Sequence, residues 1–326
     1  MRQALAHLAS LRLSLAGMLW LGASLFAIAA SSELDRDWLL PPLALLAVNL
    51  LAAIAVNRAF RRRPGLLLFH CCLLGVALLG ALGQLLRFEG RIELTVGQPL
   101  QADAVAVVDA GVLAAGVDQL PTIVQGHFHV DYRPGLVRGE THTSAAPPGG
   151  EALAFGDGRP LTLRGYQFYS TPNKGYAAVV QWRGRDSVAG RGTLHFPSFP
   201  AREWQQRLDW TTPGGDALRI ELLLPERVDA AVAWRLDSRV TAGELRISDQ
   251  RGRVHSLAAG EWLALPGGAL RFERLSMWMG YRISREPQQP WLLLLCALGA
   301  LALGQDLLRG QWRRPANGER CADVHA

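Results

Sequence analysis

Two histidines separated by a single residue, His127 and His129, are the most closely spaced pair among the eight histidines of the sequence. If this segment is a β-strand, both imidazoles point to the same face. Imidazole binds transition metals and haem iron, and His142 follows nearby, so His127 and His129 are candidate haem-contacting residues. The alternative is a solvated strand face. A third ligand at a recognised zinc spacing is missing from the sequence, so we predict no metal centre.

His70 is the second candidate, because it lies in a long apolar run, where ionisable residues are uncommon and tend to be functional. It comes four residues after Leu66, which puts it roughly 6 Å from the start of a helix that begins there. The adjacent Cys71 and Cys72 would point about 100° apart on that helix, so they form neither a chelate nor a relaxed disulfide. We interpret both cysteines as packing residues and keep His70 as a candidate haem contact, with interfacial packing as the alternative.

Catalytic signatures are missing from the sequence: it has no phosphate-binding glycine loop, no GxSxG motif, no zinc-ligand spacing and no CxxCH haem attachment site. We therefore predict no catalytic residues and expect no catalytic activity of the chain's own. An exported ligand-binding enzyme is a weaker hypothesis, which only His127 and His129 support.

Four long apolar runs must position these candidates. A helix of about 20 residues spans about 30 Å, the thickness of the hydrocarbon core of a bilayer, so each run predicts a transmembrane helix. The four runs cover residues 11–30, 39–57, 66–86 and 291–308. Small residues at 27–30, "AIAA", would suit a signal peptidase, but the first run is longer than the roughly 7 to 15 residues of a signal core, so we expect an uncleaved helix.

The charge distribution predicts the orientation of these helices. Residues 88–289 hold as many acidic as basic side chains, so the net charge of +6 belongs to the flanking parts. Arginines gather at the two termini and between the second and third helices: Arg2, Arg12, Arg58, Arg61, Arg62, Arg63, Arg309, Arg313 and Arg314. The loop between the first two helices is acidic: Glu33, Asp35 and Asp37. By the positive-inside rule both termini are cytoplasmic and residues 88–289 are exported. The pI near 9.6 is then a sign of topology rather than of nucleic-acid binding.

Residues 88–289 change to short alternating runs broken by Gly, Pro and Asp, such as "RPLTLRGYQFYS" and "YAAVVQWRG". This pattern predicts an antiparallel β sandwich or a barrel-like sheet. The span contains no cysteine, so it is not a disulfide scaffold. We therefore expect three parts: helices in residues 1–87, an exported β-rich domain in 88–289, and a last helix with a cytoplasmic tail in 290–326. Cys321 lies in the tail.

Four stretches carry a family resemblance: "LASLRLSLAGMLWLGAS" (8–24), "LLLFHCCLLGVALLGALGQLLRFEGRIELTVGQ" (66–98), "GYQFYSTPNKGYAAVVQWRG" (165–184) and "YRISREPQQPWLLLLCALGALALG" (281–304). The chain resembles the ResB family of cytochrome c biogenesis proteins. The resemblance implies three helices, a large exported β-rich domain and a fourth helix, in the inner membrane of a bacterium.

The resemblance also implies a subunit of the membrane machinery that delivers haem and attaches it to cytochrome c. Its partners would be a polytopic membrane protein that handles haem, the apocytochrome c and the lipid bilayer, with no nucleic acid. The ten tryptophans here are scattered and form no WGxxWxWD-type cluster, so the attachment chemistry would belong to the partner. This chain would position the apocytochrome, and haem b in transit would be shared with the partner. His70, near the cytoplasmic side, would then act in haem loading.

An alternative keeps the same scaffold with a different client. A membrane-anchored assembly protein could serve another exported redox enzyme or a multihaem cytochrome. Several members of the ResB family carry a histidine in the last helix, whereas the last apolar run here contains none. This difference favours the alternative.

Overall fold

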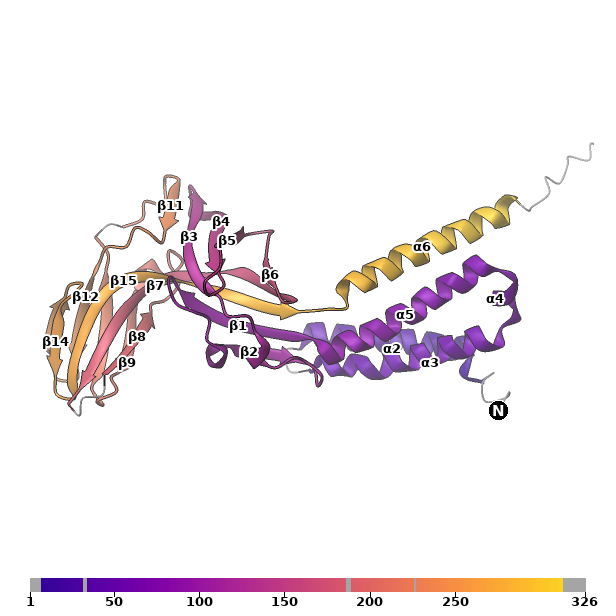
Figure 1. Cartoon of the computed structure of the whole chain (residues 1–326), viewed down its shortest axis with the longest axis horizontal. Coiled ribbons are helices and arrows are strands. Elements are labelled where there is room, and N and C mark those ends of the chain that lie inside the picture. Colours follow the sequence, from indigo (N-terminus) through magenta and orange to yellow (C-terminus); the bar gives the residue numbers. More distant parts are fainter. Residues whose placement is uncertain (1–6, 32–33, 186–188, 226, 313–326) are drawn as a thin grey trace, which may run out of the picture. The chain divides into compact units, whose positions relative to one another are not determined.

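The computed structural model describes residues 7–31, 34–185, 189–225 and 227–312. Several residues used in the predictions above lie outside these ranges: Arg2, Glu33, Arg313, Arg314 and Cys321. The chain forms two compact units (Figure 1). The helical unit comprises Met1–Arg87, Ala110–Ala114 and Glu286–Ala326, and the β unit comprises Phe88–Asp109 and Ala115–Arg285.

Among its described residues, the helical unit has five helices and one 3-10 turn: α2 (Leu11–Ala30), η1 (Arg36–Leu39), α3 (Leu40–Val56), α4 (Arg58–Arg62), α5 (Pro64–Leu86) and α6 (Gln289–Trp312). In the part of the chain that the structure describes, four helical segments are long and apolar enough to cross a membrane: Leu11–Ala30, Arg36–Val56, Pro64–Leu86 and Gln289–Arg309. The prediction of four apolar helices is confirmed. Large apolar side chains stand exposed along them, including Leu19, Phe26 and Leu301, as expected of surfaces that face lipid.

Glycines let α5 and α6 approach each other closely. A Cβ atom at Gly65 would lie 2.9 Å from Cβ of Asp306 and 3.0 Å from the carbonyl oxygen of Ala302. At Gly75 it would lie 2.6 Å from a methyl carbon of Leu295. Small residues at helix contacts are typical of membrane proteins, because close backbone packing replaces the hydrophobic effect there.

Polar side chains connect the other helices of this unit. Asn49 of α3 accepts a 2.5 Å hydrogen bond from Oγ of Ser14, and it donates to the carbonyl oxygens of Leu8 and Ser10. Arg87, directly after α5, donates to the carboxylates of Asp35 and Asp37 at 2.9 and 2.8 Å. These bonds fix the first three apolar helices beside one another.

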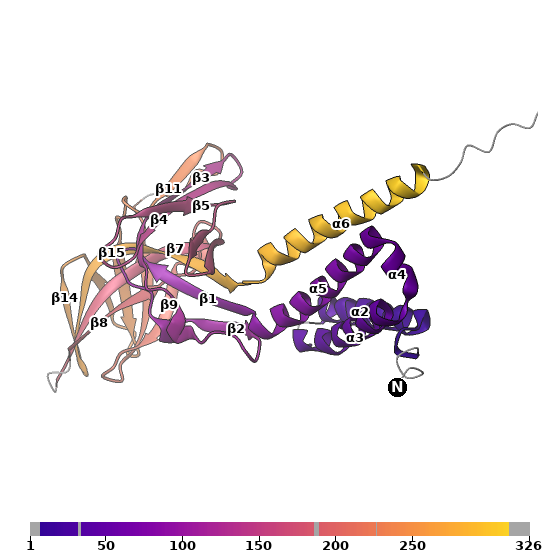
Figure 2. The ribbon, with the colours of Figure 1, turned by 45° about the vertical axis from the view of Figure 1, so that its right-hand side comes forward.

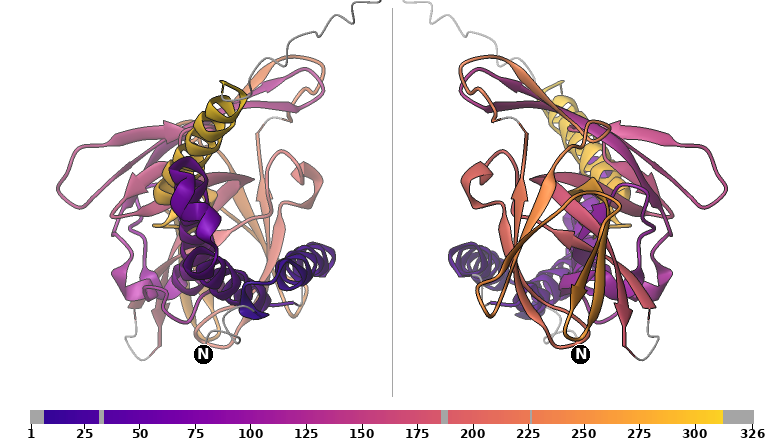
Figure 3. Two further views of the ribbon diagram at one scale, coloured as in Figure 1. Left: turned by 90° about the vertical axis from the view of Figure 1, so that its right-hand side faces the viewer. Right: turned by 90° about the vertical axis from the view of Figure 1, so that its left-hand side faces the viewer.

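The β unit holds three antiparallel sheets, so the prediction of a β-rich region is confirmed. The largest sheet has seven strands: β1 (Phe88–Thr95), β2 (Ala106–Ala110), β6 (Leu161–Leu163), β7 (Tyr166–Gly184), β8 (Ala189–His195), β14 (Trp262–Leu265) and β15 (Gly268–Arg285). Its path runs β2-β1-β15-β7-β6, with β14 paired to β15 and β8 paired to β7. Opposite views show the strong twist of the strands (Figure 3).

The two smaller sheets have four strands each. One runs β13-β12-β10-β9, from β13 (Val254–Leu257), β12 (Glu244–Asp249), β10 (Ala217–Leu223) and β9 (Arg207–Thr211). The other runs β11-β3-β4-β5, from β11 (Trp234–Asp237), β3 (Val124–Arg133), β4 (Val137–Ala146) and β5 (Leu153–Gly156), which lie together in Figure 2. Three short 3-10 turns complete the unit: η2 (Ala102–Ala104), η3 (Val117–Gln119) and η4 (Glu203–Gln205).

The long strand β15 carries the core of the β unit. Its residues Leu275 to Tyr281 are buried without the usual alternation, and Met277 and Met279 are fully inaccessible to solvent. β15 is therefore covered on both faces in this stretch. Its neighbours are β1 and β7, and Phe88, the first residue of β1, pairs with Arg285, the last residue of β15.

Candidate functional site

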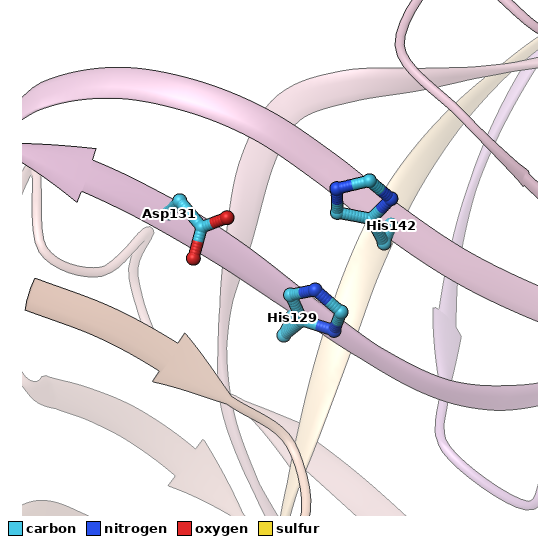
Figure 4. A group of neighbouring side chains, drawn as sticks. All are labelled: His129, Asp131 and His142. Carbon is cyan, nitrogen blue, oxygen red and sulfur yellow. The ribbon is translucent and has the colours of Figure 1, made fainter.

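Sheet β11-β3-β4-β5 positions a cluster of three ligand-type side chains, His129, Asp131 and His142 (Figure 4). One donor atom from each lies within 4.8 Å of those of the other two. The cluster follows from strand alternation: Phe128, Val130 and Tyr132 of β3 are buried, so the residues between them point to the opposite, outer face.

A three-residue turn and a bulge set the strand register at this cluster. Arg133 of β3 pairs with Val137 of β4, and Gly135 between them has φ +82°, which glycine adopts without strain. A register shift between Val130 and Tyr132 then places His142 directly opposite His129. Their rings stack with centroids 4.8 Å apart and planes 28° apart.

Charged neighbours surround the cluster. Nε of Arg235, which pairs with Asp131 across the sheet, donates a 2.7 Å hydrogen bond to Oδ1 of Asp131. This hydrogen bond lowers the pKa of Asp131 below its ordinary value, and the nearby His129 and His142 act in the same direction. The carboxylate of Glu140 lies 3.5 Å from Nε2 of His142. Asp131 is thus held by Arg235 on one side and lies beside two imidazoles on the other.

His127, which the sequence analysis paired with His129, lies outside this cluster. Its Nδ1 lies 3.2 Å from Oγ of Ser238, which also accepts a hydrogen bond from the backbone N–H of Phe128. Its side chain lines a cavity of about 310 Å³ together with Arg239 and Arg274. The structure therefore separates the two predicted histidines: His129 joins His142 and Asp131, while His127 joins Ser238.

His70 lies in the second turn of α5. Its Nδ1 donates a 2.8 Å hydrogen bond to the carbonyl oxygen of Leu66, which leaves Nε2 as the ring nitrogen that could bind an iron. Two aromatic rings lie beside it, Phe60 at 4.5 Å and Phe69 at 5.3 Å between centroids. The ring is half-buried within the helical unit.

A second polar group lies around His195, which sequence reasoning did not select. Nδ1 of His195 lies 2.9 Å from Oε2 of Glu93, and Nε2 lies 2.8 Å from Oγ1 of Thr95. The order acid, imidazole and hydroxyl matches that of a hydrolase triad. Thr95 is only 1% exposed, however, so a substrate could not reach its hydroxyl. The ring of His195 also stacks on Trp278, with centroids 5.3 Å apart, so we interpret the group as a polar contact that joins β1, β8 and β15.

Lys174 of β7 is fully buried, and its Nζ has no hydrogen-bond partner among the described residues. Burial lowers its pKa to about 7, and the charge of Arg138 acts in the same direction. Sequence offers one signal for this residue, a lysine amid strand residues in "TPNKGYAAVV".

Comparisons with known proteins give this chain no relatives: no protein-family model matches it, and no curated protein does.

Proposed function

We propose that this chain is a ResB-like subunit of a membrane complex that matures cytochrome c, where it positions the apocytochrome for a partner that handles haem. The observation that carries the proposal is the chain order, with three apolar helices, a β unit of three sheets and a fourth apolar helix. The resemblance in the sequence motifs at residues 66–98 and 281–304 supports it, since these stretches join the helices to the β unit.

The proposal includes the orientation in a bacterial inner membrane. The four helices cross the bilayer, both termini are cytoplasmic and the β unit is on the exported side. The two ends of α5 each carry an ion pair. Arg63 before α5 contacts Asp306 of α6 at 2.5 Å, and Arg87 after α5 contacts Asp35 and Asp37. The arginines at 58 and 61–63 precede α5 at its proposed cytoplasmic end, as the positive-inside rule expects.

The contribution of this chain to the reaction would be positioning. Attachment of haem needs two thiols of the client aligned with the haem vinyl groups, and holding reactants in place can supply much of a rate enhancement without acid or base catalysis. The β unit brings no cysteine of its own, so it cannot form a disulfide with those thiols. His70 would contact haem through Nε2 during loading from the cytoplasmic side.

Deletion of the gene tests the proposal. We expect c-type cytochromes in the deletion strain to lack covalent haem in a haem-stained gel, and the restored gene to recover the staining. Unchanged staining would overturn the proposal. Purification of the complemented chain should recover a polytopic partner, together with haem that shows an optical spectrum.

His70→Ala tests the haem contact separately. The adjacent Cys71→Ala is a matched control, because it changes the next residue of the same helix. We expect His70→Ala to reduce or shift the haem absorption of the purified complex and Cys71→Ala to leave it unchanged. An equal spectrum for wild type and His70→Ala would contradict the haem contact and leave the positioning role in place.

A second candidate is an assembly protein for a different exported redox enzyme. It is favoured by α6, whose sequence from Gln289 to Trp312 contains no histidine. In that case the deletion strain would keep normal c-type cytochromes and lose the activity of one exported redox enzyme.

A further inference from the structure

We propose that His129, Asp131 and His142 form a binding site for a borderline divalent transition-metal cation, Zn²⁺ or Cu²⁺, on the outer face of sheet β11-β3-β4-β5. The proposal is independent of a role in cytochrome maturation. It rests on the strand positions of the three residues and on the chemistry of their donor atoms.

The backbone already presents the ligands at suitable positions. His129 and His142 face each other across β3 and β4, and Asp131 is two residues from His129 on the same face. Around a tetrahedral zinc ion with bonds of about 2.0 to 2.1 Å, donor atoms lie roughly 3.3 Å apart. The donors here lie within 4.8 Å of one another. Rotation of the half-buried and exposed side chains closes this difference, and the strands keep their pairing.

The donor set selects the class of ion. Two imidazole nitrogens and one carboxylate oxygen suit zinc, copper and related metals, whereas calcium and magnesium prefer oxygen ligands alone. Three protein ligands leave at least one coordination position for water or an external ligand. The carboxylate of Glu140 lies 3.5 Å from Nε2 of His142 and adds an oxygen-bearing group beside the three.

Arg235 competes with the metal for Asp131. Its guanidinium holds Oδ1 at 2.7 Å, so a cation must bind the other oxygen or displace the arginine. Without the arginine, the carboxylate is freed for the metal and a positive charge is removed from the site. The proposal therefore predicts that Arg235→Gln tightens metal binding, which a solvated polar face with no metal site would not do.

The experiment is a titration of the full chain in detergent, purified without a polyhistidine tag, with Cu²⁺ followed by electron paramagnetic resonance and with Zn²⁺ followed by calorimetry. We expect one bound Cu²⁺ with splitting from two imidazole nitrogens, which added Zn²⁺ displaces. Substitution of a residue that hydrogen-bonds a metal ligand typically weakens metal binding by about 10- to 100-fold. Loss of a ligand itself should weaken metal binding at least as much. We expect this loss for His129→Ala, His142→Ala and Asp131→Asn.

His127→Ala is the matched control, because it removes a histidine from the same strand and face that lies outside the cluster. We expect it to keep wild-type affinity and the two-nitrogen signal. Circular dichroism of every variant checks that the sheets are intact. The proposal is overturned if the wild type gives no two-nitrogen signal, if His127→Ala weakens binding as much as His129→Ala, or if folded His129→Ala and His142→Ala variants bind as the wild type does.

Discussion

The hydroxyl of Tyr281 donates a 2.6 Å hydrogen bond to Oε1 of Gln125, and this bond joins strand β15 of the seven-stranded sheet to strand β3 of the sheet that carries the histidine cluster. Both side chains are 1% exposed. Nε2 of Gln125 also donates to Oγ1 of Thr143 on β4. A buried polar network of this kind stabilises a fold only while every member keeps its partner.

Tyr281→Phe should therefore destabilise the β unit. The substitution leaves the carbonyl oxygen of Gln125 without this donor, and an unsatisfied buried acceptor costs about 1 to 3 kcal/mol. Denaturant unfolding of the full chain, followed by tryptophan fluorescence, measures the loss. Tyr169→Phe is the control, because the Tyr169 hydroxyl donates its hydrogen bond to Gln167 on the exposed surface, and we expect a change in stability near zero. Equal stability of the two variants would contradict a role for the network.

Lys174 predicts a pH dependence of stability. Its pKa falls from 10.5 in the unfolded chain to about 7 in the folded chain, so between these values the unfolded chain binds more protons. The free energy of unfolding should then rise with pH from about 7 upward, by at most about 5 kcal/mol. Burial also raises the pKa of Tyr176 to about 12, so tyrosines ionise first in the unfolded chain and oppose this trend above pH 10. The measurement belongs between pH 7 and 9.

Lys174→Met isolates this effect. Methionine has a similar length and no charge, so the variant should be more stable than the wild type at pH 7 and should lose the slope with pH. Arg251→Met is the control, because it removes one positive charge from an exposed position. We expect this variant to keep the rise of the unfolding free energy with pH. A slope that persists in Lys174→Met would show that another group titrates.

Gly65→Val should weaken the contact between α5 and α6. Its Cβ atom would lie 2.9 to 3.0 Å from atoms of Asp306 and Ala302, so the helices must move apart, and overpacking of this kind costs about 1 to 3 kcal/mol. Gly22→Val on α2 is the control, because nothing lies within 4 Å of a Cβ there. Thermal midpoints in lipid nanodiscs provide the comparison. If both variants melt alike, the close approach at Gly65 does not stabilise the unit.

The orientation in the membrane can be read by cysteine labelling. In a variant without Cys71, Cys72, Cys296 and Cys321, we expect an impermeant maleimide to label Trp204→Cys in intact spheroplasts, because this side chain is 77% exposed on the β unit. Asn57→Cys, between α3 and α4, should react only after the membrane is opened. The reverse labelling would place the β unit in the cytoplasm.

Sequence predicted the apolar helices well, because their length and composition depend on neighbouring residues alone. The last helix extends further than its apolar run, from Gln289 to Trp312. Within the run, Asp306 has Arg63 as an ion-pair partner. Long-range partners of this sort are invisible in a local pattern.

The strands were harder to predict than the helices. The runs "RPLTLRGYQFYS" and "YAAVVQWRG" read as two strands, yet the last five residues of the first and all of the second belong to the single strand Tyr166–Gly184. The segment "TPNKG", which separates the two runs, stays within this strand. The strand pairing shifts in register there, between Met279 and Tyr281 of the neighbouring β15. Pro and Gly signalled a turn there, but pairing with β15 kept the chain extended.

The histidine cluster could be predicted only in part. The spacing of His129 and Asp131 places both on one face, which the sequence shows. A regular ladder continued from the pair Arg133 and Val137 would set Thr141 opposite His129, and the bulge shifts this partner to His142. A shift of one residue changes which side chains meet, and no local signal marks where it occurs.

The pairing of Phe88 with Arg285 places the first and last residues of the β unit opposite each other on neighbouring strands. Directly opposed residues of antiparallel strands have Cα atoms about 4.5 to 5.5 Å apart, a gap that a tight turn can bridge. The β unit is therefore an insertion between α5 and α6 whose two ends already lie together. A deletion from Phe88 to Arg285 would leave ends that a short linker can join, and it would also remove Ala110–Ala114 of the helical unit.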